Sequence, residues 1–371
     1  MSNVEGPSQL FPSFENPQLV FSLFVFLQPI VHYFITLEFY IAIFGVLLTT
    51  LHLIILTRKH MMTSSVMSIM IGVGICDLVS MIVAISIKDI TLQFNQDLCA
   101  PPISHSVYVF FLVMMSLRDD VIRCSVWLSV FMAFIRFLSL RFATSIRMQS
   151  ISHKSVGFYC FLVCLVLSST LSTLNFSRTT LTNVGNWNPA PECVSVPLSS
   201  TYPVYEQRTS NLFLANDQLL LRGFMLLNGL TSKIVPCVLL PVLTVLLILY
   251  LRQTRKDSVS AHSSFNHSTE RTTALVIFVT VTFFVASLPS GLVAVFQVFY
   301  TDLGFIRLTI FVDHICNAVL TANSSIHCLI CFAMSTNYRT TMKNLLRLQR
   351  TKTSVIPKNS QSKTRNDRNP D

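Results

Sequence analysis

A histidine and two cysteines stand close together near the end of the last long apolar stretch of the chain. His327 is followed at once by Cys328, and Cys331 completes a C-x-x-C pair. That spacing is typical of two zinc ligands or of a redox-active dithiol. A structural zinc site needs further ligands and a redox dithiol needs its own fold, and the sequence offers neither. We therefore interpret both cysteines as packing residues of an apolar helix, with no metal and no cofactor.

Four charged side chains stand within two helical turns of another apolar stretch. The segment SLRDDVIRCS carries Arg118, Asp119, Asp120 and Arg123. Consecutive residues of a helix point to different sides, so these charges cannot all face the same surroundings. Either Arg118 or Asp119 faces a binding site while the others pair internally, with Asp313 as a candidate partner, or all of them form an internal salt-bridge network.

The composition indicates that these apolar stretches lie in a membrane. The chain has 371 residues, of which 51% are hydrophobic and only 12% are charged, whereas soluble domains are about a quarter charged. Lipid accepts apolar side chains on the outside of a helix bundle at no cost. The net charge of +10 then favours a basic membrane face, because no aromatic and basic RNA-binding pattern accompanies it.

Seven apolar stretches are long enough to cross a bilayer as helices. They lie near residues 37–57, 65–87, 107–140, 156–176, 231–251, 273–299 and 308–333. The apolar segment 19–35 is either an interfacial segment or an extension of the first helix, and an eighth crossing is a further alternative. Lys and Arg number eighteen in the loops after the first, third and fifth stretches together with the tail, and six in the other loops. The positive-inside rule then predicts an extracellular amino terminus and a cytoplasmic carboxyl terminus.

Two of the ten cysteines, Cys99 and Cys193, lie outside the apolar stretches, in loops on the predicted outer side. Because that side is oxidising, we predict that they form a disulfide. The bond would tie the loop before the third helix to the long loop after the fourth. Two unpaired thiols are the alternative.

Several motifs resemble those of rhodopsin-like G-protein-coupled receptors. GICDLVS places Asp77 in the middle of the second helix, FMAFIRFLSL places Arg136 at the end of the third, and FFVASLPSG places Pro289 in the sixth. Together with HLIILTRK, ERTT and NSSIHCLICFAMS, they are similar to the nematode serpentine receptors of class W, chemoreceptors related to the FMRFamide-type neuropeptide receptors. The resemblance covers roughly residues 37 to 350.

This resemblance implies the fold class and the function. The fold is an all-α membrane protein, a rhodopsin-like seven-transmembrane helix bundle with a short amphipathic helix after the seventh helix. The function is that of a chemosensory or neuropeptide receptor in the plasma membrane. An extracellular peptide or small-molecule ligand would activate it, and it would signal through a heterotrimeric G protein, with no enzymatic step and no nucleic-acid partner. The alternative is a membrane transporter or channel, although no internal repeat pairs the two halves of the chain.

The resemblance also implies a polar cluster inside the bundle. Asp77 belongs to it with Ser125, Asn323 and His327, and many relatives hold a sodium ion there. His327 stands where relatives carry asparagine, so we expect it within reach of Asp77. An imidazolium that replaces the sodium ion is our hypothesis, and a neutral histidine with a single hydrogen bond is the alternative.

Two further sites follow from the resemblance. Arg118 lies 18 residues before Arg136, roughly 27 Å away along a helix, which is the depth of the family's ligand pocket. We predict a ligand pocket among Arg118, Asp119, Asp120, Arg123 and Asp313. We expect G-protein coupling from Arg136, Glu270 and Arg271, and a sixth-helix switch from Phe283, Ser287 and Pro289.

The sequence departs from the family pattern at several switch positions. Ile135 replaces the acid of the third helix, Ser287 the tryptophan of the sixth, and Thr49 the asparagine of the first. Cys328 and Cys331 replace the proline and the tyrosine of the seventh helix.

These inferences divide the chain into four parts. We expect an extracellular amino-terminal segment over 1–36 and the receptor domain over 37–334. An amphipathic juxtamembrane helix follows over 335–349, with leucines toward lipid and basic residues toward phosphate. Residues 350–371 are predicted to be a disordered basic cytoplasmic tail.

Overall fold

The structure is a computed structural model, and it describes most of residues 6–351. The exceptions are residues 60, 63, 94–98, 143–152, 190, 192–196, 198, 216–217, 258–264 and 335. The side chains of residues 93, 140, 254–279, 334, 336–337 and 346–351 also lie outside the description.

Long helices form most of the described chain. They are α2 (Pro17–Leu56), α3 (Ser65–Gln93), α4 (His105–Arg141), α6 (Lys154–Ser177), α9 (Val235–Asp257), α10 (Phe265–Phe296) and α11 (Leu303–Met334). α8 (Leu219–Gly229) runs into α9 through a short π-helix, η1 (Leu230–Ile234). The short helices are α1 (Pro7–Leu10), α7 (Asn211–Leu214) and α12 (Thr336–Thr351).

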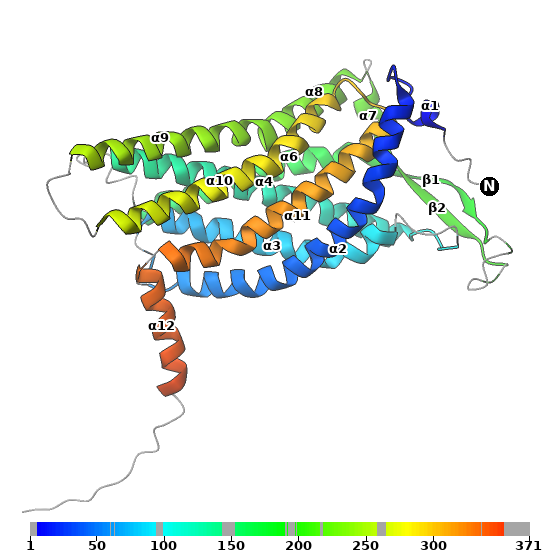
Figure 1. The fold of residues 1–371 in the computed structure, drawn as a ribbon. Coiled ribbons are helices and arrows are strands. Elements are labelled where there is room, and N and C mark those ends of the chain that lie inside the picture. Colours follow the sequence, from blue (N-terminus) through cyan, green and yellow to red (C-terminus); the bar gives the residue numbers. More distant parts are fainter. Residues whose placement is uncertain are drawn as a thin grey trace, which may run out of the picture.

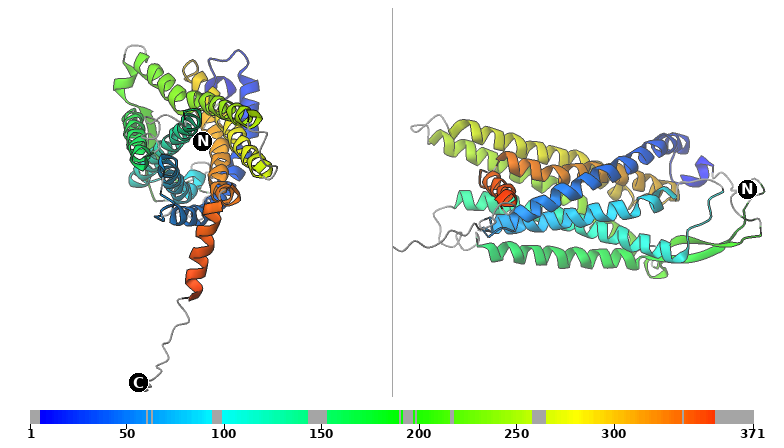
Figure 2. Two further views of the ribbon diagram at one scale, coloured as in Figure 1. Left: turned by 90° about the vertical axis from the view of Figure 1, so that its left-hand side faces the viewer. Right: turned by 90° about the horizontal axis from the view of Figure 1, so that it is seen from below.

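The long helices lie side by side in one bundle (Figure 1). α2 packs against α11 and α3, α4 packs against α3, α6 and α9, and α10 packs against α11 and α9. The amino terminus and a β-hairpin lie at one end of the bundle, called the outer end below, and α12 leaves the opposite, inner end (Figures 1 and 2).

Six of the described helices are long and apolar enough to cross a membrane, and they correspond to six of the seven predicted stretches. They are Pro17–Leu56, Ser65–Leu92, His105–Ser139, Lys154–Ser177, Leu219–Gln253 and Leu303–Ala333. The remaining stretch, 273–299, falls on α10, whose described apolar part is the shorter Thr280–Phe296. The seventh crossing is therefore not established by length.

The outside of the bundle is apolar. Tyr33, Phe44 and Val166 are each more than 60% exposed, at 73%, 68% and 63%. Soluble monomers rarely expose such contiguous apolar surface. Lipid would remove this cost, as the composition indicates.

The first helix begins much earlier than the predicted residue 37. α2 is continuous from Pro17 to Leu56, so residues 19–35 extend the first helix rather than form a separate segment. Pro29 lies inside it, and proline lacks the N–H group that would complete the helical ladder. The amino-terminal part of α2 is bent relative to the rest and leans across the outer end of the bundle (Figure 1).

The amino-terminal segment is fastened to the start of α11. Phe11 is fully buried, and Phe14 stacks on Tyr300 with ring centroids 4.3 Å apart. The Ser13 hydroxyl donates to Asp302 Oδ1 at 2.8 Å, and the Ser13 N–H donates to Asp302 Oδ2 at 3.0 Å. This end of the chain is thus part of the packed outer end.

A β-hairpin between the fourth and fifth long helices is absent from the predicted elements. β1 (Thr179–Trp187) pairs antiparallel with β2 (Tyr202–Thr209), from Thr179 opposite Thr209 to Trp187 opposite Tyr202. The register shifts between Asn183 and Gly185. Gly185 has φ of +147°, a conformation that favours glycine.

Candidate functional site

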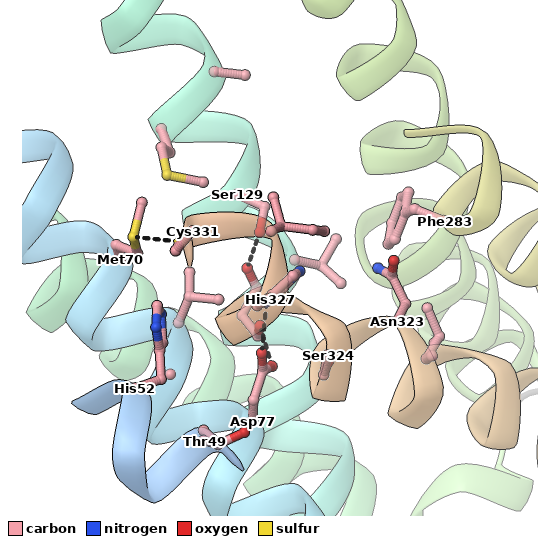
Figure 3. A pocket seen from close by; sticks show the side chains of 18 of the residues that line it. Thr49, His52, Met70, Asp77, Ser129, Phe283, Asn323, Ser324, His327 and Cys331 are labelled. Atoms are coloured by element: carbon pink, nitrogen blue, oxygen red, sulfur yellow. Dashed lines mark hydrogen bonds and ion pairs between the residues drawn. The ribbon is translucent and has the colours of Figure 1, made fainter. Parts of the chain in front are cut away.

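The buried carboxylate of Asp77 lies at the centre of the bundle and has two partners. The Ser125 hydroxyl donates to Asp77 Oδ1 at 2.8 Å, and His327 Nδ1 lies 3.3 Å from Asp77 Oδ2. Figure 3 shows the Asp77 and His327 side chains pointing toward one another from α3 and α11. The structure therefore brings together three of the four residues predicted for the polar cluster.

Asn323, the fourth predicted member, is engaged elsewhere. Its Oδ1 accepts a hydrogen bond from Thr282 Oγ1 at 3.0 Å, and Figure 3 shows it next to Phe283 rather than Asp77. Asn323 therefore joins α11 to α10, whereas His327 joins α11 to α3.

A second polar contact fastens α12 to the bundle. Tyr338, 1% exposed, has its hydroxyl 3.0 Å from Nδ1 of buried His52 and 3.4 Å from Sγ of Cys328. Burial raises the pKa of Tyr338, so its hydroxyl keeps its proton. The other cysteine of the C-x-x-C pair, Cys331, has its Sγ 3.7 Å from Sδ of Met70. Both cysteines thus pack against neighbours of α11.

We expect the loss of the Tyr338 hydroxyl to loosen α12. Tyr338→Phe and His52→Phe should each lower stability by about 1 kcal/mol, because each removes the hydrogen bond between these two buried side chains. The double variant should cost less than the sum of the two. Thermal unfolding of the purified protein in detergent measures this coupling, and strictly additive losses would show that the two side chains act independently.

A buried ion pair at the outer half of the bundle joins three helices. Arg118 of α4 is 2% exposed and Glu38 of α2 is 4% exposed, and the Arg118 Nη2 contacts the Glu38 Oε1. Thr321 of α11 donates to the same Oε1 at 2.8 Å. The candidate partner Asp313 does not take this position, so Glu38 corrects that expectation.

Arg123 is held by neutral groups on the opposite side of α4. Its guanidinium donates to Ser232 Oγ at 2.7 Å, the Ser168 carbonyl at 3.0 Å, Ser172 Oγ at 3.1 Å and Asn228 Oδ1 at 3.1 Å. Asp120 is also buried, and its Oδ2 accepts from the Ser169 hydroxyl at 2.8 Å. These two charges therefore bind α4 to α6 and α8 and are not free to meet a ligand.

Asp119 and Asp313 remain reachable. Asp119 is exposed although it lies in the middle of α4, and Lys233, Asp313, Arg123 and Arg118 are charged groups in its surroundings. Lys233 Nζ lies 3.7 Å from Asp313 Oδ1, with side chains 23% and 38% exposed. Asp313 also accepts a hydrogen bond from Ser290. Asp119, Lys233 and Asp313 are called the outer charged triad below.

The π-helix η1 supplies the lysine of this triad. A π-helical turn releases a carbonyl from the regular ladder, and here the Trp127 indole N–H donates to the Thr231 carbonyl at 2.9 Å. The same turn carries Ser232, the partner of Arg123, and Lys233. Lys233 lies within the predicted stretch 231–251, but the sequence carries no local signal that distinguishes a π-helix from the start of an α-helix.

A cavity of about 560 Å³ lies in the inner half of the bundle, and residues of α2, α3, α4, α9, α10, α11 and α12 line it. Asp77 and His327 line one part of it, and Arg136, Cys331 and Tyr338 line another. Figure 3 shows side chains of this cavity.

The structure describes some of the residues predicted for G-protein coupling and for the sixth-helix switch. Arg136 is half-buried in the cavity lining, and Phe283 of the predicted sixth-helix switch lines the same cavity. Ser287 is buried and Pro289 lies inside α10. The side chains of Glu270 and Arg271 lie outside the description. So does Cys193, and its pairing with Cys99 stays a prediction.

Residues 36–349 match the family of serpentine type 7TM GPCR chemoreceptors called Srw. A similar characterised protein is the G-protein coupled receptor dmsr-1 of Caenorhabditis elegans, which is 26% identical over 262 residues. The similar region covers 67% of this chain and 49% of that receptor, so the chain spans about half of its length.

Proposed function

Because this chain belongs to the Srw family of serpentine G-protein-coupled chemoreceptors, we propose that its ligand is an extracellular peptide bound at the outer end of the bundle. The chain is a multi-pass membrane receptor of the G-protein-coupled class. Ligand binding then shifts an equilibrium between two helix arrangements toward the one that engages a heterotrimeric G protein.

The outer charged triad is the observation that carries the peptide proposal. A peptide offers an amino group, a carboxylate and charged side chains. Asp119 has no hydrogen-bond partner within the described part of the chain, and it can accept from a cationic group. Lys233 Nζ and Asp313 Oδ1 are 3.7 Å apart, which makes a weak ion pair. A charged ligand group can therefore replace either partner with little loss of free energy.

Ligand-stimulated GTP exchange in membranes that hold the receptor and a heterotrimeric G protein tests this function. A library of charged peptides should contain activators. Activation by uncharged small molecules alone would refute the peptide ligand. Ion or solute flux without GTP exchange would favour the transporter or channel instead.

We expect Asp119→Asn to weaken the potency of a peptide agonist by about tenfold or more, because a charge-assisted hydrogen bond is lost. Asp89→Asn is the matched control, since Asp89 lies near the outer end of α3 with a side chain 91% exposed. Dose–response curves at equal surface expression measure both variants. Equal potency of Asp119→Asn and the parent would remove Asp119 from the ligand site.

The membrane topology belongs to the same proposal. α10 serves as the remaining crossing, the outer end faces the cell exterior, and α12 lies on the cytoplasmic face of the plasma membrane. The excess of Lys and Arg in the inner loops and tail supports this orientation. The proposal also includes a disulfide between Cys99 and Cys193. Coupling to the G protein would involve Arg136, Glu270 and Arg271.

A further inference from the structure

The cavity at the inner half of the bundle has the size of a ligand site. Its volume is about 560 Å³, within the range of about 300–1,000 Å³ that small-molecule pockets occupy. It is separate from the outer charged triad, because Asp119, Lys233 and Asp313 do not line it.

The cavity walls are mostly apolar and adaptable. Five methionines line it, namely Met61, Met67, Met70, Met81 and Met132. Leucine, valine and isoleucine side chains from α2, α3, α4, α9 and α11 add to them. Methionine has an unbranched, polarisable side chain that fits ligands of irregular shape. Such walls suit a flexible apolar body.

The charged groups of the cavity are satisfied with one exception. Asp77 is paired with His327 and Ser125, and His52 is bonded to Tyr338. The Arg136 guanidinium has no hydrogen bond or ion pair with any described residue, and Ile135 occupies the preceding position, where an acid could have paired with it. A half-buried guanidinium that has no partner among the described side chains attracts an anion.

We propose that this cavity binds a single-chain amphipathic anion, with its carboxylate or phosphate on Arg136 and its apolar chain among the methionines. Ser125 and Arg136 mark two levels of the cavity on α4, eleven residues apart, which corresponds to roughly 16 Å. That length suits a medium acyl chain. A consequence for signalling rests on the proposed function: the occupant covers Arg136, which meets the G protein, and therefore opposes coupling.

Binding of laurate tests the site without any agonist or G protein. The full-length receptor in nanodiscs of zwitterionic lipid should bind one laurate saturably, as measured by native mass spectrometry. Dodecanol, which has the same chain and no charge, should bind about tenfold or more weakly. In discs that contain an anionic phospholipid, undiminished laurate binding would identify a free amphiphile as the ligand, and competition would identify the lipid headgroup. Equal binding of laurate and dodecanol would overturn the proposal.

Three variants locate the site. Arg136→Gln should weaken laurate binding about tenfold or more, whereas Arg141→Gln, five residues along α4 and exposed, should leave it unchanged. Ala133→Phe should abolish binding, since Ala133 lines the cavity and a phenyl ring would fill it. Unchanged binding in both Arg136→Gln and Ala133→Phe would refute the location. Laurate should lower agonist-stimulated GTP exchange. Binding without that effect would retain the site and refute only its opposition to coupling.

Discussion

Replacement of Arg118 by methionine is expected to destabilise the receptor by about 3–5 kcal/mol. The substitution leaves the Glu38 carboxylate, only 4% exposed, without its counter-charge, and a single hydrogen bond from Thr321 remains. Thermal unfolding in detergent and delivery to the cell surface both measure this loss. Because the side chains have similar length, the effect would arise from charge rather than from a cavity.

Two comparisons test the origin of that effect. Glu38→Gln combined with Arg118→Met should recover most of the loss, because no buried charge then remains unpaired. Arg123→Met should cost less than Arg118→Met, because the described partners of Arg123 are neutral. If Arg118→Met melts like the parent protein, the pair does not hold α2, α4 and α11 together.

The burial of the ion pair also helps to distinguish charged residues that stabilise the fold from those that can face a ligand. The segment SLRDDVIRCS carries four charged residues, and the sequence shows only that they point to different sides. Arg118, Asp120 and Arg123 are buried, whereas Asp119 is exposed. A charge that is already paired and desolvated gains little from a ligand, so Asp119 is the member of this segment that can contribute to recognition.

The apolar stretches made the long helices predictable, because a bilayer-spanning helix needs about 20 apolar residues. The partner of Arg118 was missed for a related reason. The first stretch was predicted from residue 37, with residues 19–35 as either an interfacial segment or an extension of it, so Glu38 stood at the edge of the predicted stretch. In the structure α2 continues to Pro17, and Glu38 lies well inside it. An acid inside an apolar stretch would have carried the same functional signal as Asp77.

Long-range contacts at the outer end could not be predicted from local patterns. The β-hairpin pairs two segments that an insertion separates. In the π-helix, the Thr231 carbonyl accepts a hydrogen bond from the indole N–H of Trp127 in α4. The proximity of His327 to Asp77 was predicted only because the family resemblance fixes which helix faces meet. The position of Asn323 toward Thr282 follows from packing of α10, which no motif specifies.

Agonist binding to this receptor is expected to be insensitive to sodium. His327 Nδ1 lies 3.3 Å from Asp77 Oδ2, in the place where the resemblance implies a sodium ion. Our hypothesis is that an imidazolium there supplies the positive charge itself and joins α3 to α11. His327→Asn removes that charge and opens a position for the ion, so sodium should then lower agonist affinity. A coupling of about 1–3 kcal/mol corresponds to a factor of about 5–150.

Radioligand competition in sodium and in an equal concentration of a large organic cation separates this effect from ionic strength. The double variant His327→Asn with Asp77→Asn should lose the sodium effect again, because the carboxylate that binds the ion is gone. His52→Asn is the matched control, since His52 lines the same cavity but is bonded to Tyr338, and it should not create sodium sensitivity. Sodium inhibition of the parent receptor, equal in size in His327→Asn, would show that His327 does not replace the ion. In that case the contact with Asp77 would be that of a neutral histidine, and the inactive arrangement of α3 and α11 would depend on sodium.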